Sequence, residues 1–350
     1  MTILNKGGKE IKDRPVHRWP TSRMASFISF PSLCFIIFFS CLIRAADANA
    51  QHPFTVLSYN IENAFDTIHD EGKNDLEFCA EGDHHWTKGR LFKKLKNVAK
   101  VIAAADEDRP IDLVGLCEVE NDTVMEYLTR RTPLVNLGYH YIMTHSDDER
   151  GIDVALLYSP FTFHPVDTQH IKPHIPEHPT RDILHVAGTI ASGDTLDVYV
   201  LHLPSKRGGA EAQRRSMKVV ALLQENLDSV LACRQHPNLI LMGDFNADSR
   251  SPQLKALTRH LPLKDQTARL KPGTYKYQGE WSTLDHILTH TTTLSPTLSR
   301  ILSLPFLIEP DPTHGDIKPR RTYLGPIYKG GVSDHLPIMT RFNLLPSTPQ

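Results

Sequence analysis

The chain has 350 residues, of which 23% are charged and 40% hydrophobic, an ordinary composition for a globular protein. This composition excludes a wholly disordered chain, a collagen and a protein with many membrane spans. The 39 basic and 40 acidic residues give a formal charge of −1, so no global positive charge indicates binding to nucleic acid.

The first fifty residues have the features of a secretory signal peptide. A basic stretch precedes an almost uncharged apolar run over residues 24–43, and the small-residue tripeptide 48–50 follows. This order predicts cleavage after Ala50 and export to the periplasm or the medium. Met24 offers a second start site. The remaining chain would be a domain of residues 51–346 with a short tail.

Two other interpretations of this segment stay open. The apolar run approaches the length of a spanning helix, which would make it an N-terminal membrane anchor. Cys41 is a candidate attachment site for a lipoprotein. After signal cleavage we expect no stable membrane partner, and we expect a monomer. The first fifty residues hold seven basic and three acidic residues, so the chain from residue 51 carries 32 basic and 37 acidic residues, a net charge of −5.

Apolar runs and amphipathic segments alternate along the rest of the chain. Short apolar runs bounded by turn residues predict strands at 54–59, 111–117, 152–158, 183–190, 196–203, 238–243, 284–289 and 336–342. Apolar residues at helical spacing predict helices at 88–105, 121–130, 209–232 and 252–260. This alternation predicts a layered α/β fold with mixed sheets. Residues 66–87 and 304–331 are long polar loops, and loops of this length are usually functional or disordered.

Polar side chains gather at or beside the ends of the predicted strands. They are Asn60, Glu62, Glu118, His202, Asp244, Asn246, Asp285, Asp334 and His335. Each alone has a structural interpretation, such as a turn residue or a helix cap. Ligand sites in layered α/β proteins favour strand ends, so the whole set predicts a functional site.

The chemistry of this set suits the cleavage of a phosphate ester with the help of a metal. Hard oxygen ligands favour Mg²⁺, with Mn²⁺ or Ca²⁺ as alternatives, and Glu118 and Glu62 are the best carboxylate candidates. His335 is a candidate acid or base with Asp285 available to orient its ring. Asp244 is a candidate to hold the attacking water.

Side chains that donate hydrogen bonds complete the predicted site. Asn246, Asn60 and His202 are candidates to stabilise the charge on phosphate oxygens in the transition state. Arg150, Lys206 and Arg207 are candidate phosphate contacts on the rim of the site.

Six segments in order resemble the endonuclease/exonuclease/phosphatase superfamily, the deoxyribonuclease-I-like fold. They are SYNIEN, GLCEVEN, HLPSKRGG, MGDFNA, LDHIL and SDHLP, and the resemblance covers about residues 54–343. It implies a four-layer α/β sandwich of two packed mixed β-sheets flanked by helices. It also implies that Glu118 is the principal metal ligand, with Asn60, Glu62 and Asp334 on the metal side. The implied catalytic residues are His335, Asp244, His202, Asn246 and Asp285.

The resemblance implies a metal-dependent phosphoric ester hydrolase and leaves its substrate open. The first interpretation is a secreted endonuclease that acts on DNA with little sequence preference, which His202 favours and the net charge of −5 opposes. The alternative is a phosphatase or phosphodiesterase for a small phosphoester, such as an inositol phosphate or a sphingomyelin-like head group. A surface module that binds nucleic acid or a partner without turnover is the alternative from another class.

Overall fold

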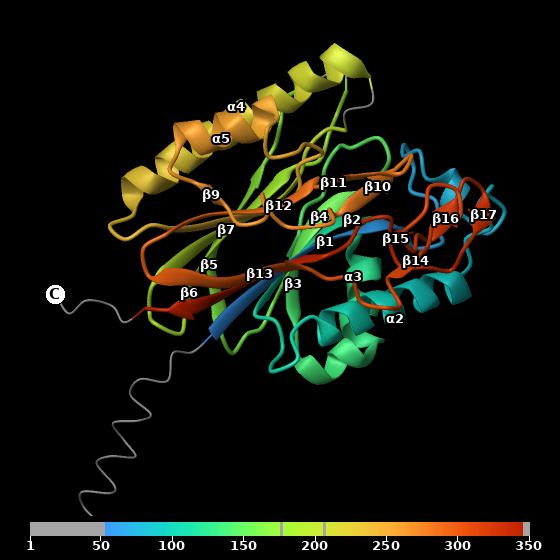
Figure 1. Ribbon diagram of the computed structural model, residues 1–350, viewed down its shortest axis with the longest axis horizontal. Helices are drawn as coiled ribbons and strands as arrows, with labels where there is room; N and C mark the ends of the chain where they lie inside the picture. The colour runs from blue at the N-terminus through green and yellow to red at the C-terminus, as the bar shows by residue number, and fades with distance from the viewer. Residues whose placement is uncertain (1–52, 176–177, 206–207, 346–350) are drawn as a thin grey trace, which may run out of the picture. The chain divides into compact units, whose positions relative to one another are not determined.

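The computed structural model describes residues 53–175, 178–205 and 208–345, and two six-stranded sheets pack face to face in it (Figure 1). The first sheet has the order β13 (Leu294–Ile301), β18 (Ile338–Leu344), β1 (Pro53–Ala64), β2 (Leu113–Val119), β4 (Asp153–Tyr158) and β3 (His140–Met143). The second has the order β5 (Phe163–Ile171), β6 (Ile183–Ile190), β7 (Thr195–His202), β8 (Asn238–Asp244), β12 (Asp285–Thr291) and β9 (Lys264–Asp265). The predicted signal peptide, Lys206 and Arg207 lie outside the described residues.

Helices cover the outer face of each sheet, so the described chain has four layers (Figure 1). The first sheet is covered by α2 (Lys88–Ala104) and α3 (Asp122–Arg130), and the second by α4 (Gly209–Cys233) and α5 (Pro252–His260). This confirms the predicted four-layer α/β sandwich. Among the described residues, no helix combines the length and the hydropathy that crossing a membrane requires.

Shorter elements fill the loops. Two 3₁₀ helices span Leu76–Phe78 and Pro133–Leu137. Three small hairpins are formed by β10 (Tyr275–Tyr277) with β11 (Glu280–Ser282), β14 (Ile308–Pro310) with β15 (Ile317–Pro319), and β16 (Tyr323–Leu324) with β17 (Ile327–Tyr328). The last two hairpins lie in the predicted 304–331 loop, which is therefore an ordered segment with its own strand pairs.

The core is divided into three layers by the alternation of side chains along the strands. Because successive strand residues point to opposite faces, β1 sends Val56 into the space between the sheets and Leu57 and Tyr59 toward α2 and α3. In the second sheet, Ile240 of β8 faces the other sheet and Leu241 faces α4 and α5. These near-continuous apolar strands are typical of sheets that are covered on both faces.

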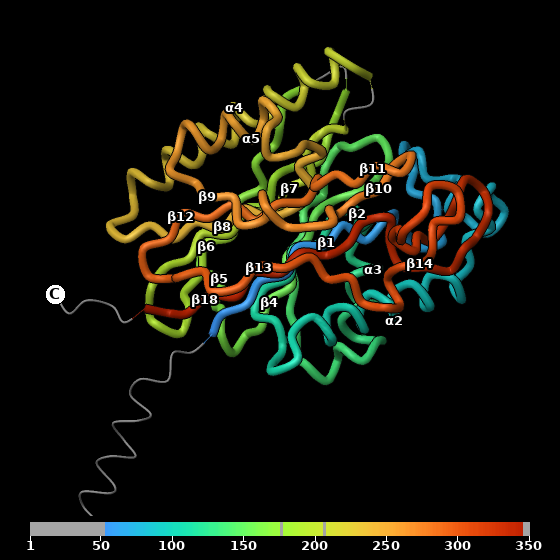
Figure 2. The backbone as a smooth tube through the Cα atoms, viewed as in Figure 1, coloured from blue at the N-terminus to red at the C-terminus, as the bar shows by residue number. Residues whose placement is uncertain are grey.

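The first and last long strands of the described chain are neighbours in one sheet. β1 pairs with β18 in antiparallel register and with β2 in parallel register. Figure 2 shows the blue tube of β1 beside the red tube of β18. This pairing brings the residues that precede β18 to the end of β1 where Asn60 and Glu62 lie.

Candidate active site

The site lies between the two sheets, at the end of the strands where the inward-facing side chains change from apolar to polar. In β8, the inward series Ile240 and Met242 continues to Asp244. In β7, the inward series Val198 and Val200 continues to His202. The same period of two places Asn60 on β1 and Asp285 on β12 between the sheets. A polar side chain thus replaces an apolar one at one end of four strands.

Strand register aligns three of these side chains in the second sheet. Asp244 pairs with His202 across the parallel β7–β8 ladder and with Asp285 across the antiparallel β8–β12 ladder. The Nε2 atom of His202 lies 3.6 Å from Asp244 Oδ2. Asp244 is therefore the centre of the row, with a histidine on one side and a carboxyl on the other.

Gly243 allows β7 and β8 to approach closely just before Asp244. Its φ of 141° lies in a region that disfavours residues with a side chain, and a Cβ atom there would lie 1.9 Å from the Leu201 carbonyl oxygen. The glycine of the GDFN segment is thus required by the backbone that presents Asp244.

Glu118 reaches the same space through an irregular backbone. Its φ is 64°, and the pairing of β2 with both neighbouring strands shifts between Cys117 and Val119, as in a β-bulge. Four of the seven non-glycine residues with positive φ among the described residues belong to this site: Glu62, Asn63, Glu118 and Asn246. Such backbone strain concentrates at functional sites. Glu118 does not cap α3, because Asn121 Oδ1 accepts the Val124 N–H there.

Asn60 joins the two sheets across the site. Its Nδ2 atom donates to Glu118 Oε1 at 3.3 Å and to Asp244 Oδ2 at 3.1 Å. Its Oδ1 atom accepts the backbone N–H of Glu62 at 3.0 Å. Asn60 therefore holds a carboxylate of each sheet in place through hydrogen bonds.

His335 contacts two side chains of the second sheet, Asp285 and Asp244. Its Nδ1 atom lies 2.7 Å from Asp285 Oδ2, and its Nε2 atom lies 3.8 Å from Asp244 Oδ2. Its backbone N–H donates to Ser333 Oγ, and that hydroxyl donates to the Asn60 carbonyl oxygen. Asp285 thus orients the ring, and Nε2 is the nitrogen that faces the site.

Burial and neighbouring charges set the protonation of these groups. Burial opposes the charged form of His335, but the carboxyl groups of Asp285 and Asp244 raise its pKa well above the ordinary value. Burial raises the pKa of Asp244 to about 7. Burial lowers the pKa of His202 well below the ordinary value, so its ring is neutral. Asp244 is therefore poised near neutral pH beside a protonated His335.

Glu118 remains ionised despite its burial. Burial opposes the charge, but the Arg150 guanidinium and the Asn63 N–H contribute to holding its pKa at about 2. The Arg150 Nη2 atom lies 3.6 Å from Glu118 Oε2, and Asn63 N–H donates to the same oxygen at 2.8 Å. Arg150, one of the predicted phosphate contacts, is therefore beside the site.

Arg321 connects the two remaining predicted carboxylates. Its Nε atom lies 3.3 Å from Glu62 Oε1 and its Nη2 atom 2.9 Å from Asp334 Oδ2. The Thr322 N–H donates to Glu62 Oε2 at 2.6 Å, and buried Lys94 of α2 donates to Thr322 Oγ1 at 2.7 Å. Arg321 was not predicted from the sequence. It lies in the polar 304–331 loop, where no pattern distinguishes it.

Two hydrogen bonds hold Asn246 beside Asp244. Its backbone N–H donates to Asp244 Oδ1 at 2.7 Å, and its Nδ2 atom donates to the Leu203 carbonyl oxygen at 2.9 Å. All nine residues predicted for the catalytic and metal sites thus lie within one network, in which Asn60 connects Glu118 to Asp244.

The donor set fits a hard divalent cation. Five carboxyl groups meet here, those of Glu62, Glu118, Asp244, Asp285 and Asp334, against the cationic side chains of Lys94, Arg150, Arg321 and His335. The Oδ1 atom of Asp285 is buried and has no hydrogen-bond partner among the described residues. Ligand atoms of Asp244, Asp285 and His335 lie within 4.8 Å of one another, and of these the two carboxyl groups are the donors while His335 is protonated. An excess of oxygen donors of this kind suits Mg²⁺ or Mn²⁺.

Comparisons with known proteins agree with this geometry. The sequence model of the Endonuclease/Exonuclease/phosphatase family matches residues 55–343. The search of curated proteins found no similar sequence. Among solved structures, a mannosyl-6-phosphatase of Bacteroides thetaiotaomicron is 19% identical with a TM-score of 0.56, and the match covers 83% of this chain and 99% of that one.

Two further structures share the fold at similar identity. The catalytic domain of human Nocturnin with a bound sulfate anion is 20% identical with a TM-score of 0.54, over 83% of this chain and 94% of that one. TDP2 of D. rerio, complexed with a single-strand DNA product, is 16% identical with a TM-score of 0.54, over 83% and 99%. At these identities the likeness concerns the fold.

Proposed function

This chain belongs to the endonuclease/exonuclease/phosphatase family and is a phosphoester hydrolase, and on that premise we propose that it is a secreted endonuclease that cleaves DNA with Mg²⁺. The observation that carries the proposal is that Asp244 lies beside His335 and that Asn60 connects Asp244 to an ionised Glu118. This arrangement provides a base near neutral pH, a protonated donor and a ligand for a divalent cation in one site.

The residues of the second sheet act on the attacking water and the phosphate. Asp244 accepts a proton from the water, because its pKa of about 7 leaves it partly ionised at neutral pH. His335, protonated and fixed by Asp285, donates a hydrogen bond from Nε2 to a phosphate oxygen as negative charge develops. Neutral His202 and the amide of Asn246 are further polar groups beside that oxygen.

The residues of the first sheet would bind the cation and supply the charged groups around it. Glu118 would be the main ligand of a divalent cation, and Asn60 donates a hydrogen bond that fixes its carboxylate. Bound there, a divalent ion supplies Lewis-acid polarisation of the phosphoryl group. Glu62 and Asp334 lie on the same side with Arg321 between them, so this part of the site already contains one fixed positive charge.

DNA is the first substrate because His202 favours the nuclease branch of the family. His202 matches a histidine that the deoxyribonuclease branch uses to contact phosphate or the leaving group, and its Nε2 atom lies 3.6 Å from Asp244 Oδ2. The D. rerio TDP2 neighbour, which shares the fold, was solved with a single-strand DNA product.

A small phosphoester is the second candidate, and the charge of the chain favours it. A net charge of −5 from residue 51 onward gives little general attraction for a polyanion, whereas a small ester needs only local cations. The mannosyl-6-phosphatase neighbour acts on a substrate of that size, as its name indicates.

The test incubates the full-length protein with supercoiled plasmid in Mg²⁺, then in EDTA, with His335→Ala as the control. We expect nicking that requires the metal and disappears in the variant. Nicking that persists in the variant would remove His335 from the catalytic residues. If plasmid stays intact in Mg²⁺, Mn²⁺ and Ca²⁺ while p-nitrophenyl phosphate is hydrolysed, the substrate is a small phosphoester.

A further inference from the structure

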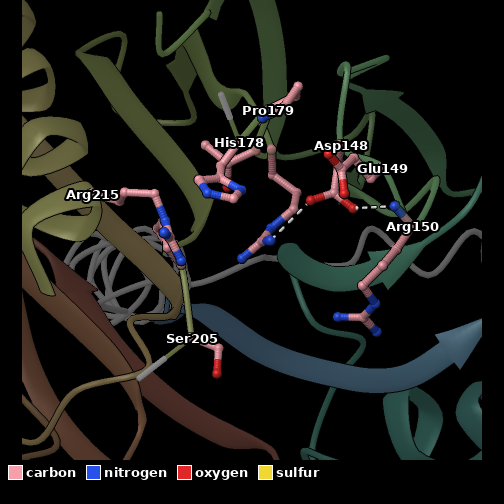
Figure 3. Close-up of a pocket in the computed structure, with 10 residues that line it drawn as sticks. Asp148, Glu149, Arg150, His178, Pro179, Ser205 and Arg215 are labelled. Atoms are coloured by element: carbon pink, nitrogen blue, oxygen red, sulfur yellow. Dashed lines mark hydrogen bonds and ion pairs between the residues drawn. The ribbon is translucent and has the colours of Figure 1, made fainter. Parts of the chain in front are cut away.

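A cavity of about 200 Å³ lies beside the hydrolytic site, between loops of the two sheets (Figure 3). One wall comes from residues 148–150, which precede β4, and another from residues 178–181, which precede β6. Ser205, after β7, and Arg215 of α4 complete the lining with Pro204. The space is ample for a phosphate group, since a single water molecule needs only about 10–15 Å³.

The cavity is adjacent to the hydrolytic residues through two arginines. Arg150 lines it and also contacts Glu118 at 3.6 Å. Arg181 lines it and donates from Nε to the carbonyl oxygen of His202 at 3.2 Å. A molecule whose phosphoester lies at Glu118 and Asp244 would therefore place a neighbouring group in this cavity.

The wall that carries Arg181 is fixed. Its guanidinium is buried and donates to Asp148 Oδ2 at 3.0 Å and to the Leu203 carbonyl oxygen at 2.8 Å. Asp148 also accepts the backbone N–H of Arg150, as the dashed lines of Figure 3 show. This network joins loops of both sheets, so the cavity is preorganised.

One arginine of the cavity has no ion-pair partner among the described residues. Arg181 pairs with Asp148 and Arg150 pairs with Glu118, which leaves Arg215. Arg215 is half-buried, and no hydrogen bond or ion pair holds its guanidinium within residues 53–175, 178–205 and 208–345. Figure 3 shows Arg150 and Arg215 on opposite sides of the cavity. Guanidinium groups placed in this way suit the several oxygens of one phosphate.

A buried hydroxyl group adds an independent observation. Thr180 lines the cavity and is 7% exposed, and its Oγ1 atom has no hydrogen-bond partner in the described part of the chain. Buried hydroxyl groups are normally paired, so an unpaired one at a cationic wall indicates a missing acceptor.

We propose that this cavity binds a second phosphate of the substrate, next to the phosphate that is hydrolysed. The proposal rests on the proposed function, because it assumes that a phosphoester lies at Glu118 and Asp244. The second phosphate belongs either to the adjacent nucleotide of a DNA strand or to a small bisphosphate. Arg215 and Arg150 contact its oxygens from opposite sides, and Thr180 donates to it.

The experiment compares probes that differ only in the second phosphate. Calorimetry on the full-length protein in EDTA, where hydrolysis stops, gives Kd values for butyl phosphate against 1,4-butanediol bisphosphate. Thymidine dinucleotide with and without a terminal phosphate forms the nucleic-acid arm. We expect the second phosphate to lower the Kd at least tenfold in one arm, and that arm identifies its source.

Arg215→Gln is the test variant and Arg214→Gln its matched control. Arg214 is the preceding residue of α4 but pairs with Glu211 instead of lining the cavity. We expect the tenfold gain to disappear in Arg215→Gln and to persist in Arg214→Gln, with unchanged Tm in both. Equal Kd values for the probes of both arms, or a gain that survives Arg215→Gln, would overturn the proposal.

Turnover of the same probes in Mg²⁺ separates this proposal from the proposed function. A preference for the second phosphate in EDTA without hydrolysis of any probe supports the cavity and rejects the hydrolase function proposed for DNA. Hydrolysis with identical KM for both probes of each pair supports the function and rejects the cavity.

Discussion

His335 is the residue whose replacement we expect to affect turnover most, since its Nε2 faces the site while Asp285 holds Nδ1. We expect His335→Ala to lower kcat by about 10²- to 10⁴-fold, the usual contribution of a positioned acid or base. His185→Ala is a matched control, because His185 is also buried and paired with a carboxylate, Asp197, at 2.9 Å. Activity assays and thermal melts of both variants check this; equal loss of activity in the two would contradict a catalytic role.

Asp244 predicts a pH dependence of activity. Burial raises its pKa to about 7, so the base is protonated and inactive at lower pH. We therefore expect kcat/KM to rise about tenfold per pH unit up to about pH 7 and then to level off. A pH profile measured in excess metal tests this. A limb near pH 4, the range of an ordinary aspartate, would remove Asp244 as the base.

Glu118 predicts the response to metal. Replacing its carboxylate in Glu118→Gln removes the ionised ligand, so we expect the Mn²⁺ concentration for half-saturation to rise at least tenfold. Binding of Mn²⁺ measured by electron paramagnetic resonance gives this value without turnover. Glu126→Gln is the control, since Glu126 is an exposed carboxylate of α3 outside the site. An unchanged Mn²⁺ affinity in Glu118→Gln would exclude it as the ligand.

Site residues at the ends of strands could be predicted from the sequence, whereas Arg321, which lies in a loop, could not. Asn60, His202 and Asp244 continue the period-two pattern of apolar strands, so the sequence itself marks them. Arg321 lies in a polar loop with no pattern, and only the folded chain brings it to Glu62 and Asp334. Among the arginines of the cavity, Arg150 was a predicted phosphate contact, whereas Arg181 lies in another loop and was not predicted, for the same reason.

At the scale of elements, the contact between β7 and β8 is the most constrained. We expect Gly243→Ala to lower the free energy of unfolding by about 3 kcal/mol, since the added Cβ meets the Leu201 carbonyl oxygen in a backbone region that alanine avoids. Urea denaturation measures this. Gly193→Ala is the comparison, with a positive φ but no atom within 4 Å of the added Cβ. An equal loss in both would show that the close approach is not the cause.

In the two large sheets, the strands that were not predicted from the sequence lie at the edges. β3, β5 and β13 are edge strands, and two-residue β9 is the fourth edge. An edge strand is partly exposed to solvent, so its sequence contains polar residues and lacks the continuous apolar run that marks a central strand. The sequence FHPVDTQHI of β5 is an example. The covered central strands, by contrast, are almost continuously apolar and were all predicted.

For the whole molecule, the testable expectation concerns export. If the first fifty residues are a signal peptide, protein recovered outside the cytoplasm begins at Gln51. N-terminal sequencing of that protein determines the first residue. A start that keeps the apolar run 24–43, with the protein in the membrane fraction, would favour an anchor.

The pairing of β1 with β18 also determines when the enzyme becomes active during its synthesis. Sheet one cannot close until residues 338–344 have left the ribosome, and Asp334 and His335 emerge only just before them. A nascent chain therefore carries Glu118 and Asp244 long before it carries His335. We therefore expect chains truncated before residue 334 to lack hydrolytic activity, so that activity would arise only after synthesis has passed β18.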